Sequence, residues 1–198
     1  MKKSVFLSAL AVAGLTVGAA GAQTLEAVQS NGTLKCGVST GLVGFAAPDA
    51  SGEWEGFDVS YCRAVAAAIL GDSNAVEFVP TTGKTRFTAL ASGEVDLLAR
   101  NTTWTFSRDI DLGFTFVGVN YYDGQGFMIR KDLGVASATE LDGATVCIQT
   151  GTTTELNLAD YFRVNNISYQ PVPIETNAAA QQQSLAGACD VYTTDRSA

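Results

Sequence analysis

Two arginines and several hydroxyl and amide side chains follow one short apolar segment, Val95–Ala99. A guanidinium group can hold a carboxylate through two parallel hydrogen bonds, and hydroxyl donors can share the same anion. The pattern therefore predicts a carboxylate site, although a polar surface loop in which Arg108 pairs with Asp109 or Asp111 fits the same residues. The polar candidates are Arg100, Asn101, Thr103 and Arg108.

Two further polar elements lie later in the chain. The segment Gln149–Thr153 runs from a predicted strand into a predicted helix, whose free N–H groups and positive dipole end favour an anion. Thr152 and Glu155 have capping-box spacing, which leaves Thr153 free to reach a ligand, although simple capping also explains the element. Asp195 could neutralise an ammonium group, or act as a turn or N-cap residue. Together the elements predict a pocket that complements a zwitterion, such as a free amino acid.

Strand-like and helix-like segments alternate along the chain and would position these groups. A helix predicted to begin at an Asp58 N-cap ends at Gly71, and a later amphipathic helix groups Leu156, Ala159, Tyr161 and Phe162 on one side. The alternation predicts an α/β fold with largely parallel sheets, whose ligands bind past the carboxyl ends of the strands. The predicted strands are 34–38, 75–80, 95–99, 124–131, 144–150, 167–173 and 189–194, and the predicted helices are 57–71, 84–91, 152–165 and 177–187.

The two halves of the chain share a short pattern. Segments 90–96 and 185–190 each end a predicted helix on glycine and enter a strand through aspartate. Aligning the two glycines sets Asn101 opposite Asp195, each just past the end of its strand. The pattern predicts two lobes built on one plan and joined near Tyr121–Gly124.

The first 22 residues have the layout of a secretory signal peptide. Lys2 and Lys3 precede the uncharged apolar stretch Val5–Val17, and Ala20-Gly21-Ala22 offers a small-x-small cleavage pattern. A membrane anchor is the alternative, but spanning a bilayer takes about 20 apolar residues. We therefore expect an exported protein whose mature chain is soluble.

The amino-acid composition disfavours several kinds of partner and catalytic site. The net charge is −8 without clustered lysine or arginine, which disfavours nucleic acid as a partner. The absence of histidine disfavours Ser-His-Asp and Cys-His catalysis and most zinc sites, and no cofactor or metal is expected. Four cysteines in an exported chain suggest disulfides, with three possible pairings: the residues are Cys36, Cys62, Cys147 and Cys189.

From about Gln23 to Ala198 the chain resembles the periplasmic amino-acid-binding proteins of ABC importers, particularly the branch that accepts many L-amino acids. The RNTTWTFSRD and QTGTTTEL strings are the most specific to that branch. The resemblance implies a two-lobed Venus-flytrap fold with a signal peptide over 1–22, a first lobe over 23–122 and a second lobe over 123–198. The segments that carry it are GTLKCGVSTGLVGFAAPD, GEWEGFDVSYCRAVAAAILGD, KTRFTALASGEVDLLARNTTWTFSRD, CIQTGTTTELNL and CDVYTTDRSA.

The resemblance also implies residue roles. Arg108 would bind the ligand α-carboxylate with help from Thr103, Thr153 would assist from the other lobe, and Asp195 would receive the α-amino group. Arg100 would reach a side-chain acid of the ligand or be structural. The remaining expected pocket residues are Asn101, Phe45 and Trp104.

The family pairing of cysteines implied here is Cys36 with Cys62 and Cys147 with Cys189, one bridge within each lobe. Family members are longer and cross back to complete the first lobe, so the chain is expected to be C-terminally truncated with an incomplete first lobe.

The function implied is binding of free L-amino acids in the periplasm, by a monomer and without catalysis, for delivery to the permease of an ABC importer. Two alternatives are a dehydratase-like periplasmic enzyme of the same fold and a sensory ligand-binding module.

Overall fold

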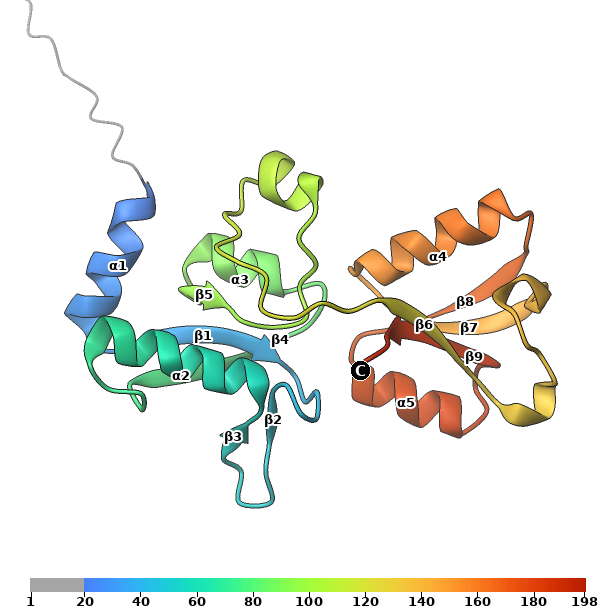
Figure 1. The fold of residues 1–198 in the computed structure, drawn as a ribbon, viewed down its shortest axis with the longest axis horizontal. Helices are drawn as coiled ribbons and strands as arrows, with labels where there is room; N and C mark the ends of the chain where they lie inside the picture. Colours follow the sequence, from blue (N-terminus) through green and yellow to red (C-terminus); the bar gives the residue numbers. More distant parts are fainter. Residues whose placement is uncertain (1–19) are drawn as a thin grey trace, which may run out of the picture.

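A computed structural model describes residues 20–198, which form two lobes that each consist of a small sheet and its helices (Figure 1). The predicted signal peptide, residues 1–22, lies outside this range apart from its last three residues, which open helix α1 (Ala20–Asn31). Among residues 20–198, no helix has the length and apolar character needed to cross a membrane.

The first lobe is built on three parallel strands in the order β4-β1-β5. The central strand is buried along almost its whole length because strands flank it on both sides and helix α2 covers it. Its strands are β1 (Leu34–Ser39), β4 (Val76–Thr81) and β5 (Leu97–Leu98), beside the hairpin β2 (Ala47–Pro48) and β3 (Trp54–Glu55). Its later helices are α2 (Phe57–Leu70), α3 (Arg86–Ser92) and the π-helical turn η1 (Ser107–Asp111).

Helix α2 confirms the predicted element and corrects its start. Gly56 is the N-cap, so Asp58 lies within the first turn, where it is 3% exposed. The predicted capping role of Asp58 is therefore wrong. The predicted stop is confirmed: Gly71 ends the helix at φ 76°, a left-handed conformation that glycine adopts without strain.

The second lobe has a four-stranded sheet in the order β6-β9-β7-β8, in which only the edge strand β6 is antiparallel within the described chain. Helices α4 and α5 cover its opposite faces (Figure 1). Along β7, Val146 and Ile148 pack with α4 while Cys147 packs with the α5 side, which is the two-residue alternation of a strand covered on both faces. The elements are β6 (Gln125–Ile129), η2 (Lys131–Leu133), η3 (Ala138–Glu140), β7 (Ala144–Gln149), α4 (Thr153–Val164), β8 (Tyr169–Ile174), α5 (Asn177–Leu185) and β9 (Val191–Asp195).

Helix α4 begins as its sequence predicts. Thr152 is the N-cap and accepts a hydrogen bond from the N–H of Glu155 at 3.2 Å. The Glu155 carboxylate reaches back to the N–H of Gly151 at 2.8 Å, one residue before the cap. The predicted buried side is partly wrong, because Leu156 is 66% exposed and the packed positions are spaced by four residues: Thr154, Leu158 and Phe162.

The cysteine pairing implied by the resemblance is confirmed. Cys36 bonds Cys62, and Cys147 bonds Cys189, so that each disulfide stays within one sheet and its cover.

The two lobes repeat one connection, as the shared pattern predicts. Asp96 accepts a hydrogen bond from the N–H of Lys35, and Asp190 accepts one from the N–H of Thr145, both at 2.9 Å. Lys35 and Thr145 are each the second residue of the central strand of their lobe. The same carboxylate–strand link therefore fixes β5 and β9 in register.

Tyr121 and Asp123, in the segment between the two sheets, contact different lobes. The ring of Tyr121 packs against Phe45 of the first lobe at 5.1 Å between centroids. Two residues later, the Asp123 carboxylate accepts hydrogen bonds from the N–H and hydroxyl of Ser197, beside the second-lobe strand β9. The boundary after residue 122 stays a prediction.

Candidate functional site

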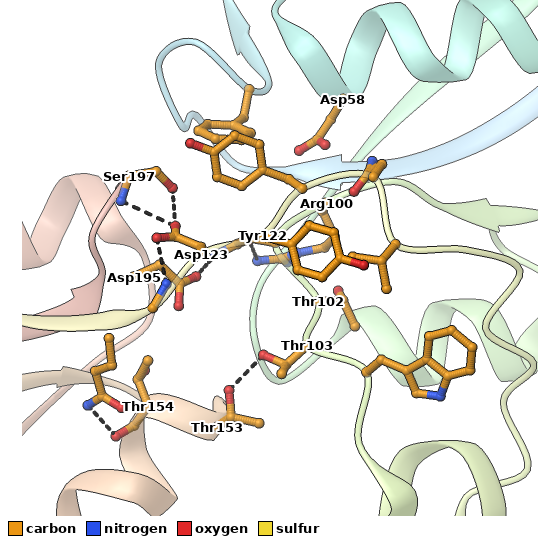
Figure 2. A pocket seen from close by; sticks show the side chains of 18 of the residues that line it. Asp58, Arg100, Thr102, Thr103, Tyr122, Asp123, Thr153, Thr154, Asp195 and Ser197 are labelled. Carbon is orange, nitrogen blue, oxygen red and sulfur yellow. Dashed lines mark hydrogen bonds between the residues drawn. The ribbon is translucent and has the colours of Figure 1, made fainter.

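A cavity of about 390 Å³ lies between the lobes and is lined from both of them. The first lobe contributes the segment that follows β5, and the second lobe contributes the start of α4 and the end of β9 (Figure 2). Seven of the predicted ligand-binding residues line it: Phe45, Arg100, Asn101, Thr103, Trp104, Thr153 and Asp195.

Four of the predicted site residues meet in pairs across the cleft. The Asn101 side-chain amide donates to the Asp195 carboxylate at 3.3 Å, which brings together the two positions that the internal pattern aligned. The hydroxyl oxygens of Thr103 and Thr153 lie 2.8 Å apart. A dashed line joins them in Figure 2. Because Thr152 is occupied as the cap, Thr153 is the hydroxyl that faces the first lobe.

Arg108 lies behind this lining. It is 7% exposed, its guanidinium donates to the Thr103 carbonyl at 2.8 Å, and it sits 5.1 Å from the centroid of the Phe87 ring. The surface ion pair proposed as an alternative is not observed within residues 20–198, because Asp109 instead accepts a hydrogen bond from the indole of Trp104 at 2.8 Å. Arg108 is thus a buried cation outside the cavity lining, fixed to the backbone carbonyl of Thr103.

Arg86 is a functional candidate that the sequence reasoning missed. It is 1% exposed, and it spans the lobes by donating to the Asn101 carbonyl at 3.3 Å and to the Gly151 carbonyl at 3.0 Å. It also lines a narrow space of about 10 Å³ together with Thr153 and Asp195. At the start of a short helix an arginine is ordinarily solvated, so the sequence offered no signal that this one is buried.

The buried charges around the cavity do not balance. Burial and the neighbouring guanidinium groups of Arg100 and Arg108 lower the pKa of Arg86, although Asp195 opposes the change. Guanidinium groups keep their proton at neutral pH, so all three arginines are cationic. Burial raises the pKa of Asp195, and the hydrogen bond from Asn101 partly offsets that rise. Asp58 is buried and Asp195 is partly buried, so the buried groups carry an excess of positive charge, while Asp123 adds an exposed carboxylate to the cavity lining.

Arg100 and Asp58 occupy the first-lobe wall of the cavity. Arg100 is 6% exposed and donates to the Thr81 carbonyl at 2.6 Å and to the Asn101 side-chain oxygen at 2.9 Å. Asp58 also escaped the sequence reasoning, which assigned it to capping, and the only signal was its place at a helix start near a glycine-rich loop.

Aromatic side chains form a further part of the wall. Trp104 stacks on Phe116 with ring centroids 5.4 Å apart and planes 8° apart. Phe45 packs edge-on against Phe57 and Tyr121. These rings offer the apolar surface that usually accompanies a few polar groups in a small-molecule site. Among residues 20–198, no group of three or more cysteine and carboxylate side chains is placed to hold a metal ion.

Comparison with known proteins agrees with the resemblance found in the sequence. The model of the bacterial extracellular solute-binding proteins, family 3, matches residues 34–191. The chain is 64% identical to the glutamate/glutamine/aspartate/asparagine-binding protein of Rhodobacter capsulatus and 58% identical to the general L-amino acid-binding periplasmic protein of Rhizobium johnstonii. In both cases the alignment covers 100% of this chain and 58% of the relative, so the chain spans little more than half the length of these relatives.

A solved structure is similar over most of the fold. It is an ABC transporter/periplasmic binding protein from Brucella ovis with glutathione bound, which is 59% identical to this chain with a TM-score of 0.82. The match covers 87% of this chain and 55% of that chain.

Proposed function

Because this chain belongs to the bacterial extracellular solute-binding proteins of family 3, we propose that it binds free L-amino acids between its two lobes for import. One observation carries the proposal: Asp195 of the second lobe meets Asn101 of the first beside three buried arginines. A carboxylate on one side and guanidinium groups on the other complement the ammonium and carboxylate groups that every amino acid shares.

In the proposed complex, each predicted residue keeps its role. Arg108 and Thr103 bind the α-carboxylate, Thr153 adds a donor from the second lobe, and Asp195 accepts from the α-amino group. The Thr103–Thr153 and Asn101–Asp195 contacts, at 2.8 and 3.3 Å, support this assignment because they are the atoms that a ligand would bridge. Arg108 would have to turn from the Thr103 carbonyl to meet the ligand.

The excess of buried guanidinium groups supports a preference within the amino acids. A ligand with a second carboxylate would neutralise more of the charge of Arg86 and Arg100 than a neutral amino acid would. The buried charge therefore favours acidic amino acids, and their amides, which have nearly the same shape, fit the same space. The name of the Rhodobacter relative, a glutamate/glutamine/aspartate/asparagine-binding protein, agrees with this preference.

Delivery to a membrane permease completes the proposed function. The predicted signal peptide and the periplasmic name of the Rhizobium relative support action in the periplasm, where the proposed binding protein acts as a monomer. The relatives named above are binding proteins, which favours capture without turnover over a dehydratase-like enzyme. Nothing in residues 20–198 specifically favours the sensory alternative.

The test is to purify the full natural protein without added ligand and to identify any co-purifying small molecule by mass spectrometry. Calorimetry with the twenty L-amino acids then ranks their affinities. We expect glutamate, glutamine, aspartate and asparagine to bind most tightly and to be recovered chemically unchanged. Turnover of a bound ligand, or the absence of binding across the panel, would refute the proposal.

A further inference from the structure

Asp58 and Arg100 both line the cavity, and each carries a buried polar atom without a partner. Asp58 is 3% exposed, and its Oδ2 accepts no hydrogen bond from residues 20–198. Arg100 is 6% exposed, and its Nε–H has no acceptor in the described part of the chain. Both side chains border the same cavity, one from the start of α2 and the other from the segment after β5 (Figure 2). One wall of the cavity therefore includes an acceptor and a donor that both lack a partner.

The guanidinium of Arg100 is held in place by neutral groups. Its two terminal nitrogens donate to the Thr81 carbonyl and to the Asn101 side chain, at 2.6 and 2.9 Å. The charges of Arg100 and Asp58 act on one another, yet no ion pair of 4.0 Å or less joins them in the described structure. The orientation of Arg100 is thus fixed, while Asp58 Oδ2 and Arg100 Nε have no hydrogen-bond partner among residues 20–198.

We propose that Asp58 and Arg100 bind the far end of the ligand side chain, and that Asp58 adapts to an amide or an acid there by losing or gaining a proton. A carboxamide would place its oxygen on Arg100 Nε–H and its N–H on ionised Asp58. A carboxylate would place one oxygen on Arg100, and Asp58, having taken a proton from solvent, would donate its O–H to the other. This inference rests on the proposed function, because it assigns the side-chain subsite of the same cavity.

The surroundings of Asp58 suit a carboxyl group that can be either protonated or ionised when a ligand binds. Burial raises the pKa of Asp58 to about 6, although the positive charge of Arg100 opposes the rise. Among the described groups, Arg100 is the one whose charge acts on Asp58. The other ionisable side chains on the elements packed against α2 are Glu26 on α1, Lys35 on β1, Glu55 on β3 and Glu77 on β4.

The experiment compares glutamate, glutamine and alanine as probes of the full natural protein. Calorimetry at steps between pH 5 and 8 gives the affinity of each. Alanine lacks the far end of the side chain, so the glutamate:alanine and glutamine:alanine ratios remove any titration of the groups that hold the α-amino and α-carboxylate ends, Asp195 included. The variants are Asp58→Asn and, as a matched control, Asp72→Asn, which neutralises an exposed carboxylate of the same lobe.

For the wild type we expect the glutamate:alanine ratio to be highest below pH 6 and to fall by up to about tenfold per unit above it, because glutamate binding then requires proton uptake. The glutamine:alanine ratio should be constant above pH 6 and fall below it. In Asp58→Asn both ratios should become independent of pH, and glutamate should bind more tightly at pH 8 than it does to the wild type. Asp72→Asn should behave as the wild type.

A glutamate:alanine ratio that does not vary with pH, or that varies equally in Asp58→Asn, would overturn the inference. Failure of all three probes to bind would instead refute the proposed function. If Asp58→Asn does not fold, calorimetry of the wild type at pH 7 in two buffers of different ionisation enthalpy decides the matter. Uptake of more protons with glutamate than with alanine supports the subsite, and equal uptake overturns it.

Discussion

Three guanidinium groups, Arg86, Arg100 and Arg108, carry the charge of the site, and each is at most 7% exposed. Their hydrogen bonds go to neutral oxygens, mainly backbone carbonyls, and the ion pairs of residues 20–198 are both on exposed surface. Such cations interact strongly with an incoming anion because little solvent screens them. The affinity of the site should therefore depend on individual side chains.

Arg108→Ala should weaken binding of every amino acid by about 2–3 kcal/mol, because it removes a charged donor to the shared α-carboxylate. The loss should be similar for alanine and glutamate. Calorimetry measures it, with Arg163→Ala as the control, since Arg163 is an exposed cation paired with Asp160 on α4. Unchanged affinity in Arg108→Ala would move the α-carboxylate role to another arginine.

Asp58→Asn should stabilise the ligand-free protein near pH 7.5. The pKa of Asp58 is raised from 3.8 to about 6, so its contribution to stability is complete below pH 4 and is lost as the pH rises through 6. At pH 7.5 the variant avoids that loss, a gain in unfolding free energy of up to about 3 kcal/mol. Urea unfolding at pH 7.5 and pH 4 measures the difference, which should vanish at the lower pH. A variant less stable than the wild type at pH 7.5 contradicts this account.

At the scale of elements, each lobe joins a central parallel strand to its neighbours through the same kind of link. Asp96 ties β5 to β1, and Asp190 ties β9 to β7, so the polar residues that follow those strands emerge at the same edge of each sheet. The two disulfides join different kinds of element. One joins β1 to α2, and the other joins β7 to the turn before β9.

Removal of the second-lobe disulfide by Cys147→Ser with Cys189→Ser should lower the unfolding free energy by roughly 4 kcal/mol, from the loop of 42 residues that it closes. Removal of Cys36–Cys62, which closes 26 residues, should cost slightly less. Thermal unfolding of both double variants tests the order. Equal affinity for ligand in the folded fraction is expected, since neither bridge lines the cavity.

At the scale of the whole molecule, the lobes touch through backbone as well as side chains. A Cβ at Gly83 would lie 2.6 Å from the Thr150 carbonyl oxygen, and one at Gly151 would lie 2.9 Å from the Gly83 oxygen. Arg86 spans the same place through its bond to Gly151. The contact between the lobes therefore depends on two glycines that allow a close approach outside the proposed ligand contacts.

Gly83→Ala should hold the lobes apart and lower ligand affinity by about 1–3 kcal/mol, the usual cost of overpacking. Its backbone is outside the left-handed region, so the stability of the ligand-free protein should change little. Calorimetry with glutamate and small-angle scattering with and without ligand measure the effect. Gly32→Ala is the control: at φ 67° in open space, it should cost stability and leave affinity unchanged. Wild-type affinity in Gly83→Ala would show that closure does not bring these glycines together.

The sequence by itself determined most of the strands and helices, their order and part of the cavity lining. Strand and helix periodicity, the Thr152 cap and the glycine stops depend on local interactions, which a single chain segment displays. The resemblance added the disulfide pairing and the roles proposed for Arg108 and Asp195. These are choices among residues distant in the chain, which periodicity does not make.

Only the tertiary structure decided which polar residues are buried. Asp58 was predicted as a helix cap, and Arg86 carried no signal, yet both prove to be enclosed by elements distant in sequence. Likewise, Leu156 is exposed despite its apolar side chain because α4 turns Leu158 and Phe162 toward the sheet. Burial depends on how helices and lobes pack together, and that packing determines the charge, the unpartnered atoms and hence the chemistry proposed for the cavity.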